Sequence, residues 1–395
     1  MATATTTLST AAAARITLYA FVCATLFSAT SSAPTPLYPL YRALYHLSPV
    51  AVTLIFASYA FALLFALLTL GRLSDFIGRR VMMLAALLCN ALALIMFMLA
   101  DSAQTLIAAR MVQGIATGIA LPTFGAAILD GDKSRGPLLN SVTAFLGLMV
   151  GSLTGALLVT LAPFPTVSIY ALLFMLMLLA LMPETVTRTS GALRALKPHV
   201  AIPPRALGAL LRLAPVNVAA WALGGFYLSL MPTLVILVTG LRSPFVGGAV
   251  VATLMLSATG SVFIFRRWQP QRALFIGTLT LMAGIGVTLI GINHHLTALL
   301  FLGTAVAGQG FGSIFSTIIS IVMPLAESHE RAGLFAAFLI KSYLAFALPA
   351  LLAGCAVPMM GLVATANAYC WGIVAMAAVS LLAGRRAVRL KPERG

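Results

Sequence analysis

The sequence predicts an all-α membrane protein of about twelve transmembrane helices, arranged as two pseudo-symmetric six-helix bundles. The first reason is composition: 61% of the 395 residues are hydrophobic, 8% are charged, and the mean hydropathy is +1.06. A soluble domain carries roughly 25% charged residues because its surface faces water. The second reason is spacing, because apolar segments of about 20 residues, enough to cross a bilayer, recur along the whole chain. The third is the basic, proline-containing segment 184–213, which separates two groups of six such segments.

The apolar segments define the expected spans and domains. The first group occupies residues 16–37, 49–70, 80–100, 103–129, 137–161 and 166–183, and the second 214–238, 244–265, 273–292, 296–324, 332–357 and 361–383. We therefore expect an N-terminal bundle at 1–183, a cytoplasmic linker at 184–213, and a C-terminal bundle with a basic cytoplasmic tail at 214–395. The alternative, a signal peptide cleaved after Ala33, would remove one span and disturb the charge pattern described next.

The chain has a net charge of +16, and the distribution of its positive residues indicates its orientation in the membrane. If the N-terminus is cytoplasmic, most of the 24 Lys and Arg residues fall in cytoplasmic segments, whereas the external loops hold only Arg42 and Arg242. This bias follows the rule that positive charge stays inside, so both termini are expected in the cytoplasm. The basic residues show no interleaved aromatic patch. Membrane lipid is therefore an expected partner and nucleic acid is not.

The most specific motif lies between the second and third spans, in the stretch Gly71-Arg72-Leu73-Ser74-Asp75-Phe76-Ile77-Gly78-Arg79-Arg80. Glycines permit a tight turn, and a carboxylate can accept hydrogen bonds from helix N-terminal amides or pair with arginines. The stretch resembles the loop signature of the major facilitator superfamily, G-x-L-x-D-x-x-G-R-R/K. The resemblance implies a cytoplasmic gating motif that latches the two halves, made of Gly71, Asp75, Gly78, Arg79 and Arg80. The alternative is a solvated charged turn. The corresponding loop of the second half, 265–272, lacks both glycines and the acid.

The fourth span contains a charged residue within an apolar segment. Arg110, Gln113 and Thr117 are spaced so that they share one helix face, and the surrounding sequence resembles the fourth-helix motif of the same family. An unpaired arginine in lipid is costly, so this face is expected to point into the protein or a wet cavity. The alternative is that Arg110 snorkels to the outer surface.

The fifth span resembles the family's antiporter motif, G-x-x-x-G-P-x-x-G-G. It carries Gly147, Gly151 and Gly155, but Ser152 replaces the proline and Ala156 replaces the last glycine. Small residues at this spacing also serve close helix packing. The two interpretations remain open.

Other polar residues mark candidate cavity faces. Ser and Thr stripes occur in span one (Thr25, Ser28, Ser32, Thr35) and span ten (Ser313, Ser316, Ser320), although such hydroxyls can instead bond to preceding carbonyls of their own helix. Gln309 lacks this local option and is a better candidate. Asn217, Trp221 and Tyr227 could add amide and aromatic contacts, or simply pack. Gln113-Gly114 recurs as Gln309-Gly310, 196 residues later, which suggests a duplicated six-helix unit.

Lys341 lies near the middle of the eleventh span, about 14 Å from its start by helix rise. An ammonium at that depth needs a cavity or a partner. We expect Lys341 to line the central cavity and to pair with a negative group of the solute or to exchange protons. The alternative is a shifted helix boundary that lets Lys341 snorkel toward the cytoplasm.

Several chemistries are not expected. None of the eight acids lies in the middle of a span, the five histidines fall in loops, and no Walker motif or His/Cys/acid cluster occurs. The sequence thus predicts no enzyme, no cofactor and no metal site. The resemblance covers essentially the whole chain. It implies a monomeric, multi-pass transporter of the cell inner membrane that moves a small organic solute by alternating access, most like drug-efflux proton antiporters. The alternatives are uptake or exchange of an organic anion, and a non-transporting receptor or scaffold.

Overall fold

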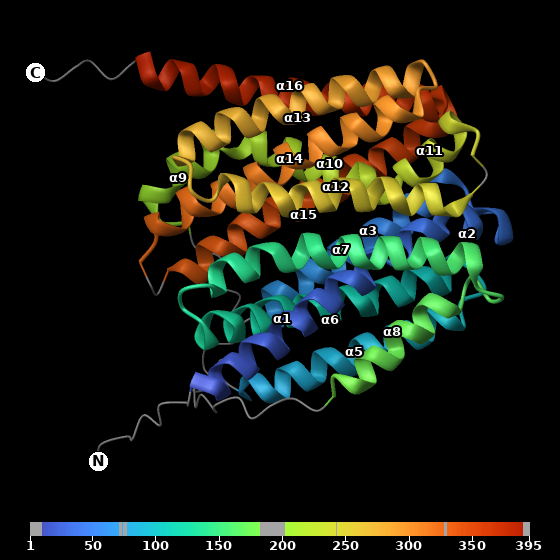
Figure 1. Cartoon of the computed structure of the whole chain (residues 1–395), viewed down its shortest axis with the longest axis horizontal. Coiled ribbons are helices and arrows are strands. Elements are labelled where there is room, and N and C mark those ends of the chain that lie inside the picture. The colour runs from blue at the N-terminus through green and yellow to red at the C-terminus, as the bar shows by residue number, and fades with distance from the viewer. Residues whose placement is uncertain are drawn as a thin grey trace, which may run out of the picture.

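The computed structural model describes residues 10–70, 73, 77–181, 202–241, 243–327 and 330–389, and the regular elements in these residues are all helices (Figure 1). Ten of the helices are long and apolar enough to cross a membrane, and one bent helix pair raises the number to eleven. A further apolar helix, α8 (Ser168–Leu179), is shorter. The all-α fold with about twelve spans is therefore confirmed.

The helices follow the predicted spans closely. In the first half they are α1 (Thr10–Ser32), the short η1 (Thr35–Leu37), α2 (Tyr38–Leu44), α3 (Pro49–Leu70), α5 (Arg79–Met98), α6 (Ala103–Gly131), α7 (Gly136–Leu161) and α8. In the second half they are α9 (Pro204–Arg212), α10 (Ala214–Ser229), α11 (Met231–Thr239), α12 (Pro244–Phe265), α13 (Pro270–Asn293), α14 (Thr297–Val322), the short η3 (Met323–Leu325), α15 (Arg331–Met360) and α16 (Leu362–Arg389).

Prolines break two of the predicted spans and lie at a bend where the predicted linker joins the second half. The first span ends at Ser32 and continues as η1 and α2, which contain Pro36 and Pro39. The seventh span is interrupted at Leu230, just before Pro232 of α11. Part of the predicted linker forms α9, which bends by 58° into α10 next to Pro215. Proline lacks the amide hydrogen that a continuing helix needs, so each break lies beside one.

The two halves pack as separate bundles that meet mainly along two helix pairs. In the first half α6 packs against α1, α3 and α5, and in the second α14 packs against α12 and α13. Across the middle, α7 packs against α12 and α3 against α15. The start of α1 and the end of α16 lie at the same end of the molecule (Figure 1), which we call the termini end. The opposite end, where α2 and α11 lie, we call the far end.

Glycines create matching close contacts in both halves. A Cβ on Gly114 or Gly118 of α6 would overlap backbone of α3 at Tyr59 and Leu63. In α14, Gly308 and Gly312 are packed in the same way on the carbonyls of Leu254 and Ala258 in α12. Small residues of this kind allow helices to approach closely within a bilayer.

The matching glycine contacts show that the 196-residue offset inferred from sequence does not align the two halves. Gly308 lies two residues before the position that a 196-residue offset from Gly114 requires. Gly310 instead packs on Leu281 of α13. The Gln113–Gln309 match is therefore coincidental, and the position equivalent to Gln113 is Ala307.

Substituting Gly114 provides a direct test of this packing. Gly114→Leu is expected to lower the free energy of unfolding by about 1–3 kcal/mol, because the added Cβ would lie 2.9 Å from Ala62 Cβ and 3.0 Å from the Leu63 amide nitrogen. Gly286→Leu is the matched control: it also improves helix propensity, but a Cβ there meets nothing within 4 Å. Thermal unfolding in detergent should separate the two variants, and equal unfolding temperatures would contradict the packing argument.

Candidate functional site

Arg110 forms the centre of a buried polar cluster in the first half. Its side chain is 1% exposed. One terminal nitrogen donates to the Ser31 carbonyl and to Gln113 Oε1, both at 2.8 Å, and the other donates to the Tyr38 hydroxyl. The guanidinium carbon also lies 5.4 Å from the centre of the Tyr59 ring, a distance at which cations are attracted to aromatic faces. Arg110 is therefore held inside the bundle and does not snorkel to the surface.

The cluster extends through two amide side chains, which join α5 and α6 to α1. Gln113 donates to the Thr30 carbonyl at 2.8 Å, and Asn90 of α5 donates to Thr30 Oγ1 at 3.1 Å. Arg110 Nε and Asn90 Oδ1 are buried without a hydrogen-bond partner. The hydrogen-bond acceptors of Arg110 are all neutral. A buried positive charge held only by neutral groups is attractive to anions.

An aromatic cluster fills the interface between the halves. We define it as Phe56, Phe145, Trp221, Phe311, Phe315, Tyr343 and Phe346, contributed by α3, α7, α10, α14 and α15. Trp221 contacts Tyr343 at 5.0 Å and Phe315 at 6.0 Å between ring centres. Phe145 crosses from the first half to meet Phe311 at 5.3 Å, and Phe56 meets Phe346 at 4.8 Å. At this cluster the two halves meet through side chains alone. The halves can therefore separate here without breaking backbone hydrogen bonds.

Trp221 carries an unused hydrogen-bond donor in this cluster. Its indole Nε1 is buried and has no partner. A buried, unpaired N–H costs about 1–3 kcal/mol, so its position calls for an explanation. Tyr59 belongs to the Arg110 cluster, because its ring lies 5.4 Å from the guanidinium carbon and its hydroxyl bonds to Ser31 Oγ at 2.8 Å. A ligand acceptor at the indole would satisfy the donor.

Two other candidates from the sequence are buried but serve packing in this state. Asn217 donates to Ser342 Oγ at 3.0 Å, which joins α10 to α15, and its Oδ1 has no partner. The Tyr227 hydroxyl bonds to Thr304 Oγ1 at 2.8 Å. Thr304 precedes Gly308 by four residues, as Arg110 precedes Gly114, so a neutral Tyr–Thr pair occupies the place that the arginine holds in the first half.

Gln309 lies apart from the other candidates. It is exposed, and at about 100° per residue it lies on roughly the opposite side of α14 from Phe311 and Phe315. The structure therefore does not bring it into the cluster.

Lys341 also points away from the aromatic cluster. It is two residues from Tyr343, which places the two side chains about 200° apart around α15. Its ammonium lies 3.4 Å from the carbonyl of Leu210 in the last turn of α9 and 5.9 Å from the Phe338 ring. The carbonyl end of a helix carries partial negative charge, and α9 lies at the termini end (Figure 1). The ammonium thus reaches toward the termini end, as in the snorkelling alternative, but α15 begins at Arg331, so the helix boundary is not shifted. Pairing of Lys341 with a solute group or a transported proton stays a prediction.

The serine and threonine stripes are largely self-satisfied. Thr25, Ser28, Ser316 and Ser320 each donate to a carbonyl three or four residues earlier. Ser32 and Ser313 additionally bond neighbouring helices, at the carbonyls of Leu148 and Ala273. These hydroxyls therefore contribute to helix packing, as the alternative held, and Thr35 Oγ1 remains buried without a partner.

The antiporter-like stretch of α7 packs against α1 on one face and α12 on the other. Along one face, Gly147 and Gly151 pack on the carbonyls of Thr25 and Ala29 in α1. On the other face, Ser152 Oγ donates to the Gly248 carbonyl of α12 at 2.9 Å, across the interface between the halves. Gly354 of α15 is packed on Thr53 of α3 near the same end. Within the described ranges, the hydrogen bonds and ring contacts that join the halves lie at the aromatic cluster or toward the far end.

The gating motif is only partly described. Gly71 and Asp75 lie outside the described residues. Gly78 has φ of 100°, a conformation that favours glycine, and precedes α5. Arg79 forms an ion pair with Asp130 at the end of α6, and beside it backbone N–H donors, led by that of Arg135, lower the pKa of Asp132. Arg79 thus ties together helices of one half.

The sequence did not indicate which aromatic residues contact Trp221 and Arg110. Tyr38, Tyr59, Phe145, Phe315 and Tyr343 sit in apolar segments where aromatic residues are routine. Their only signal is the presence of a hydroxyl or ring near a polar residue of another helix, which the sequence alone cannot reveal.

Comparisons with known proteins agree on the fold. A family model described as Major Facilitator Superfamily matches residues 20–350. The crystal structure of the nucleoside transporter NupG superposes with a TM-score of 0.72 at 13% identity, covering 94% of this chain and 99% of that chain. The human organic anion transporter MFSD10 (TETRAN) gives 0.65 at 18% identity, covering 93% and 99%. No curated protein sequence matches the chain.

Proposed function

Because the chain belongs to the major facilitator superfamily, we propose that it moves a small organic solute across the cell inner membrane by alternating access. The solute binds at the aromatic cluster, between the N-terminal half (1–183) and the C-terminal half (214–395), which the linker 184–213 connects. The observation that carries this proposal is the unpaired indole N–H of Trp221, buried among rings from both halves. A solute with a flat apolar part and a hydrogen-bond acceptor fits these groups.

The proposed orientation places both termini in the cytoplasm, as the charge bias indicates. The termini end is then cytoplasmic and the far end external. The contacts of Ser152 with Gly248 and of Gly354 with Thr53 support an external gate that is closed in this state. Asp75, Gly71, Gly78, Arg79 and Arg80 would form the cytoplasmic latch. Export in exchange for protons, by a monomer of the drug-efflux type, is the direction and coupling that the antiporter-like stretch of α7 supports.

Arg110 supports a second candidate, exchange or uptake of an organic anion. The guanidinium is buried beside Tyr59 and bonded only to neutral acceptors. At about 8 Å and an effective dielectric constant near 20, it would attract a unit negative charge by about 2 kcal/mol. Comparing flux of charged and neutral solutes of the same shape distinguishes the two candidates.

The binding site can be tested through Trp221 itself. Replacing Trp268 and Trp371 with phenylalanine leaves Trp221 as the single tryptophan, because the chain has three. Solutes that change its emission are then tested for flux into liposomes. For such a solute, Trp221→Phe is expected to raise KM about tenfold, the equivalent of one lost hydrogen bond of about 1.4 kcal/mol.

Trp268→Phe is the control, since Trp268 is exposed between α12 and α13 and should leave KM unchanged. An unchanged KM in the Trp221→Phe protein would show that the aromatic cluster does not bind the transported solute.

A further inference from the structure

An apolar crevice opens on the side of the first half, away from the aromatic cluster. It lies between α1, α7 and α8 and has a volume of about 700 Å³. Leu172, Leu176 and Leu179 of α8 form one wall and are 40–77% exposed, so the crevice is open to the surroundings of the helix bundle. In a membrane these surroundings are lipid chains.

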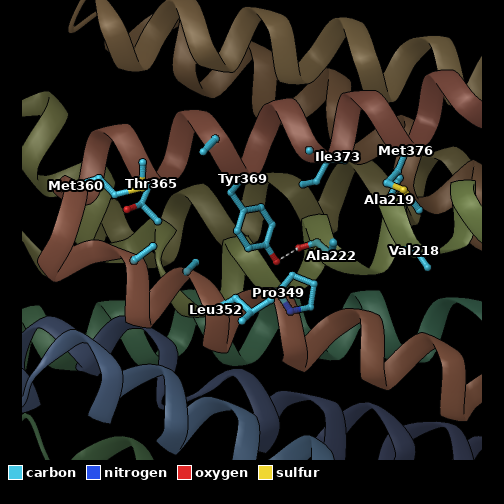
Figure 2. Close-up of a pocket in the computed structure, with 14 residues that line it drawn as sticks. Val218, Ala219, Ala222, Pro349, Leu352, Met360, Thr365, Tyr369, Ile373 and Met376 are labelled. Atoms are coloured by element: carbon cyan, nitrogen blue, oxygen red, sulfur yellow. Dashed lines mark hydrogen bonds between the residues drawn. The ribbon is translucent and has the colours of Figure 1, made fainter.

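The second half contains an equivalent crevice, shown in Figure 2, between α10, α15 and α16. These are the first, fifth and sixth spans of their half, as α1, α7 and α8 are of theirs. A tyrosine hydroxyl bridges each crevice: Tyr19 donates to the Ala180 carbonyl at 2.8 Å, and Tyr369 donates to the Ala222 carbonyl at 3.0 Å. The shared position and the shared bridge make the second crevice a natural reference for the first.

The two crevices differ in charge and in place. The second is lined by no charged residue and reaches toward the far end, at Met360 and Thr365. The first is lined by Arg15, which is exposed near the start of α1 at the termini end. Only the first therefore offers a cation at the level where a lipid headgroup would lie.

The first crevice is long enough to hold an acyl chain of one leaflet. Its lining runs along α1 from Arg15 to Ala29, a distance of about 21 Å at 1.5 Å per residue. One leaflet contributes about 15 Å of hydrocarbon. An acyl chain whose headgroup pairs with Arg15 would therefore fit within the length of the crevice.

We propose that the α1–α7–α8 crevice binds an anionic phospholipid from the leaflet at the termini end, with its phosphate at Arg15 and one acyl chain against α8. Arg15 supplies charge selectivity and the apolar walls supply the fit to the chain. Tyr19 closes the crevice behind the chain by holding α1 to the end of α8. This site is separate from the aromatic cluster and does not depend on which solute is transported.

Competition between two lipids tests the proposal. The delipidated full-length protein is incubated with equal amounts of phosphatidylglycerol and phosphatidylcholine, and retained lipids are counted by native mass spectrometry. We expect one phosphatidylglycerol to be retained at least fivefold over phosphatidylcholine. Arg15→Gln should bring this ratio close to one, and Val150→Trp, which fills the crevice from α7, should reduce retention of both lipids at least fivefold.

Two controls distinguish this site from general lipid binding. Arg42→Gln removes the same charge from the far end, and Leu352→Trp fills the second crevice in the same way; neither should change phosphatidylglycerol retention. The proposal would be overturned if Arg15→Gln and Val150→Trp left phosphatidylglycerol retention unchanged. It would also be overturned if the two control substitutions reduced this retention as much as the two test substitutions do.

A photolabelling experiment on the unmodified protein tests the same proposal without relying on variants that could misfold. Phosphatidylglycerol carrying a diazirine in its acyl chain should label peptides of α1 and α8 that contain Leu18, Leu26, Leu172 and Leu176. It should do so at least fivefold more than the exposed face of α5 at Leu88 and Leu92. Equal labelling of the two surfaces would mean that the lipid is not held in the crevice.

Discussion

Replacing Arg110 with methionine is expected to reduce transport of an anionic solute at least thirtyfold while leaving the protein folded. The lost attraction, about 2 kcal/mol for a charge placed about 8 Å away, corresponds to about that factor. The effect on stability is expected to be small because two costs oppose each other. Methionine relieves the desolvation of a buried charge, several kcal/mol, but leaves the Ser31 carbonyl, Gln113 Oε1 and the Tyr38 hydroxyl without their donor.

Flux into liposomes and thermal unfolding measure the two effects separately. Arg110→Lys keeps the charge and should retain much more transport than Arg110→Met. Arg42→Met, at an exposed arginine of the far end, controls for net charge. Transport at the unmodified rate by the Arg110→Met protein would show that Arg110 serves only the packing of α6 against α1.

Replacing Gly248 with leucine is expected to open the far end. A Cβ at Gly248 would lie 2.6 Å from the Ser152 carbonyl oxygen and would overlap Ala156. Overpacking of this kind costs about 1–3 kcal/mol. Because the cost applies only while α7 and α12 are in contact, it shifts the equilibrium between closed and open far ends by about fivefold to 150-fold. Transport should fall at least fivefold, since the cycle requires closure.

A buried cysteine can report this opening. Thr53 is fully buried against Gly354 in the closed state, so Thr53→Cys in a protein whose four native cysteines are replaced should react slowly with a water-soluble maleimide. Gly248→Leu is expected to raise that rate at least fivefold. Gly260→Leu, on the same helix where a Cβ meets nothing within 4 Å, should not. Equal reaction rates in the two leucine variants would show that the α7–α12 contact does not control opening of the far end.

Hydropathy was sufficient to predict the helices because each span must satisfy its backbone inside lipid. Spans 49–70 and 244–265 coincide with α3 and α12. The breaks after Ser32 and at Leu230 were missed although prolines lie beside them, since proline is also tolerated within long helices, as Pro122 is in α6. The amphipathic α9 was assigned to the linker because it is too short and polar to resemble a span.

The candidate site was less predictable, because the sequence gives the face of a helix but not what that face meets. For Arg110 and Gln113, their shared face was enough to predict a common cluster. For Gln309, the lack of a local carbonyl partner favoured a cavity position, but the helix face that carries it is exposed. Depth alone suggested that Lys341 lines a cavity, whereas the observed contact depends on α9, from a distant part of the chain.

Alternating access around the aromatic cluster is tested most directly by distance measurements between spin labels at both ends. One pair, Leu44→Cys with Leu241→Cys, reports the far end, and the other, Lys133→Cys with Trp268→Cys, reports the termini end; all four positions are exposed. Double electron–electron resonance should show the far-end distance lengthening and the termini-end distance shortening on introduction of Gly248→Leu, with Gly260→Leu leaving both unchanged. A longer far-end distance with an unchanged termini-end distance would mean that the substitution distorts one contact locally, and that the two halves do not rock about the cluster as this account requires.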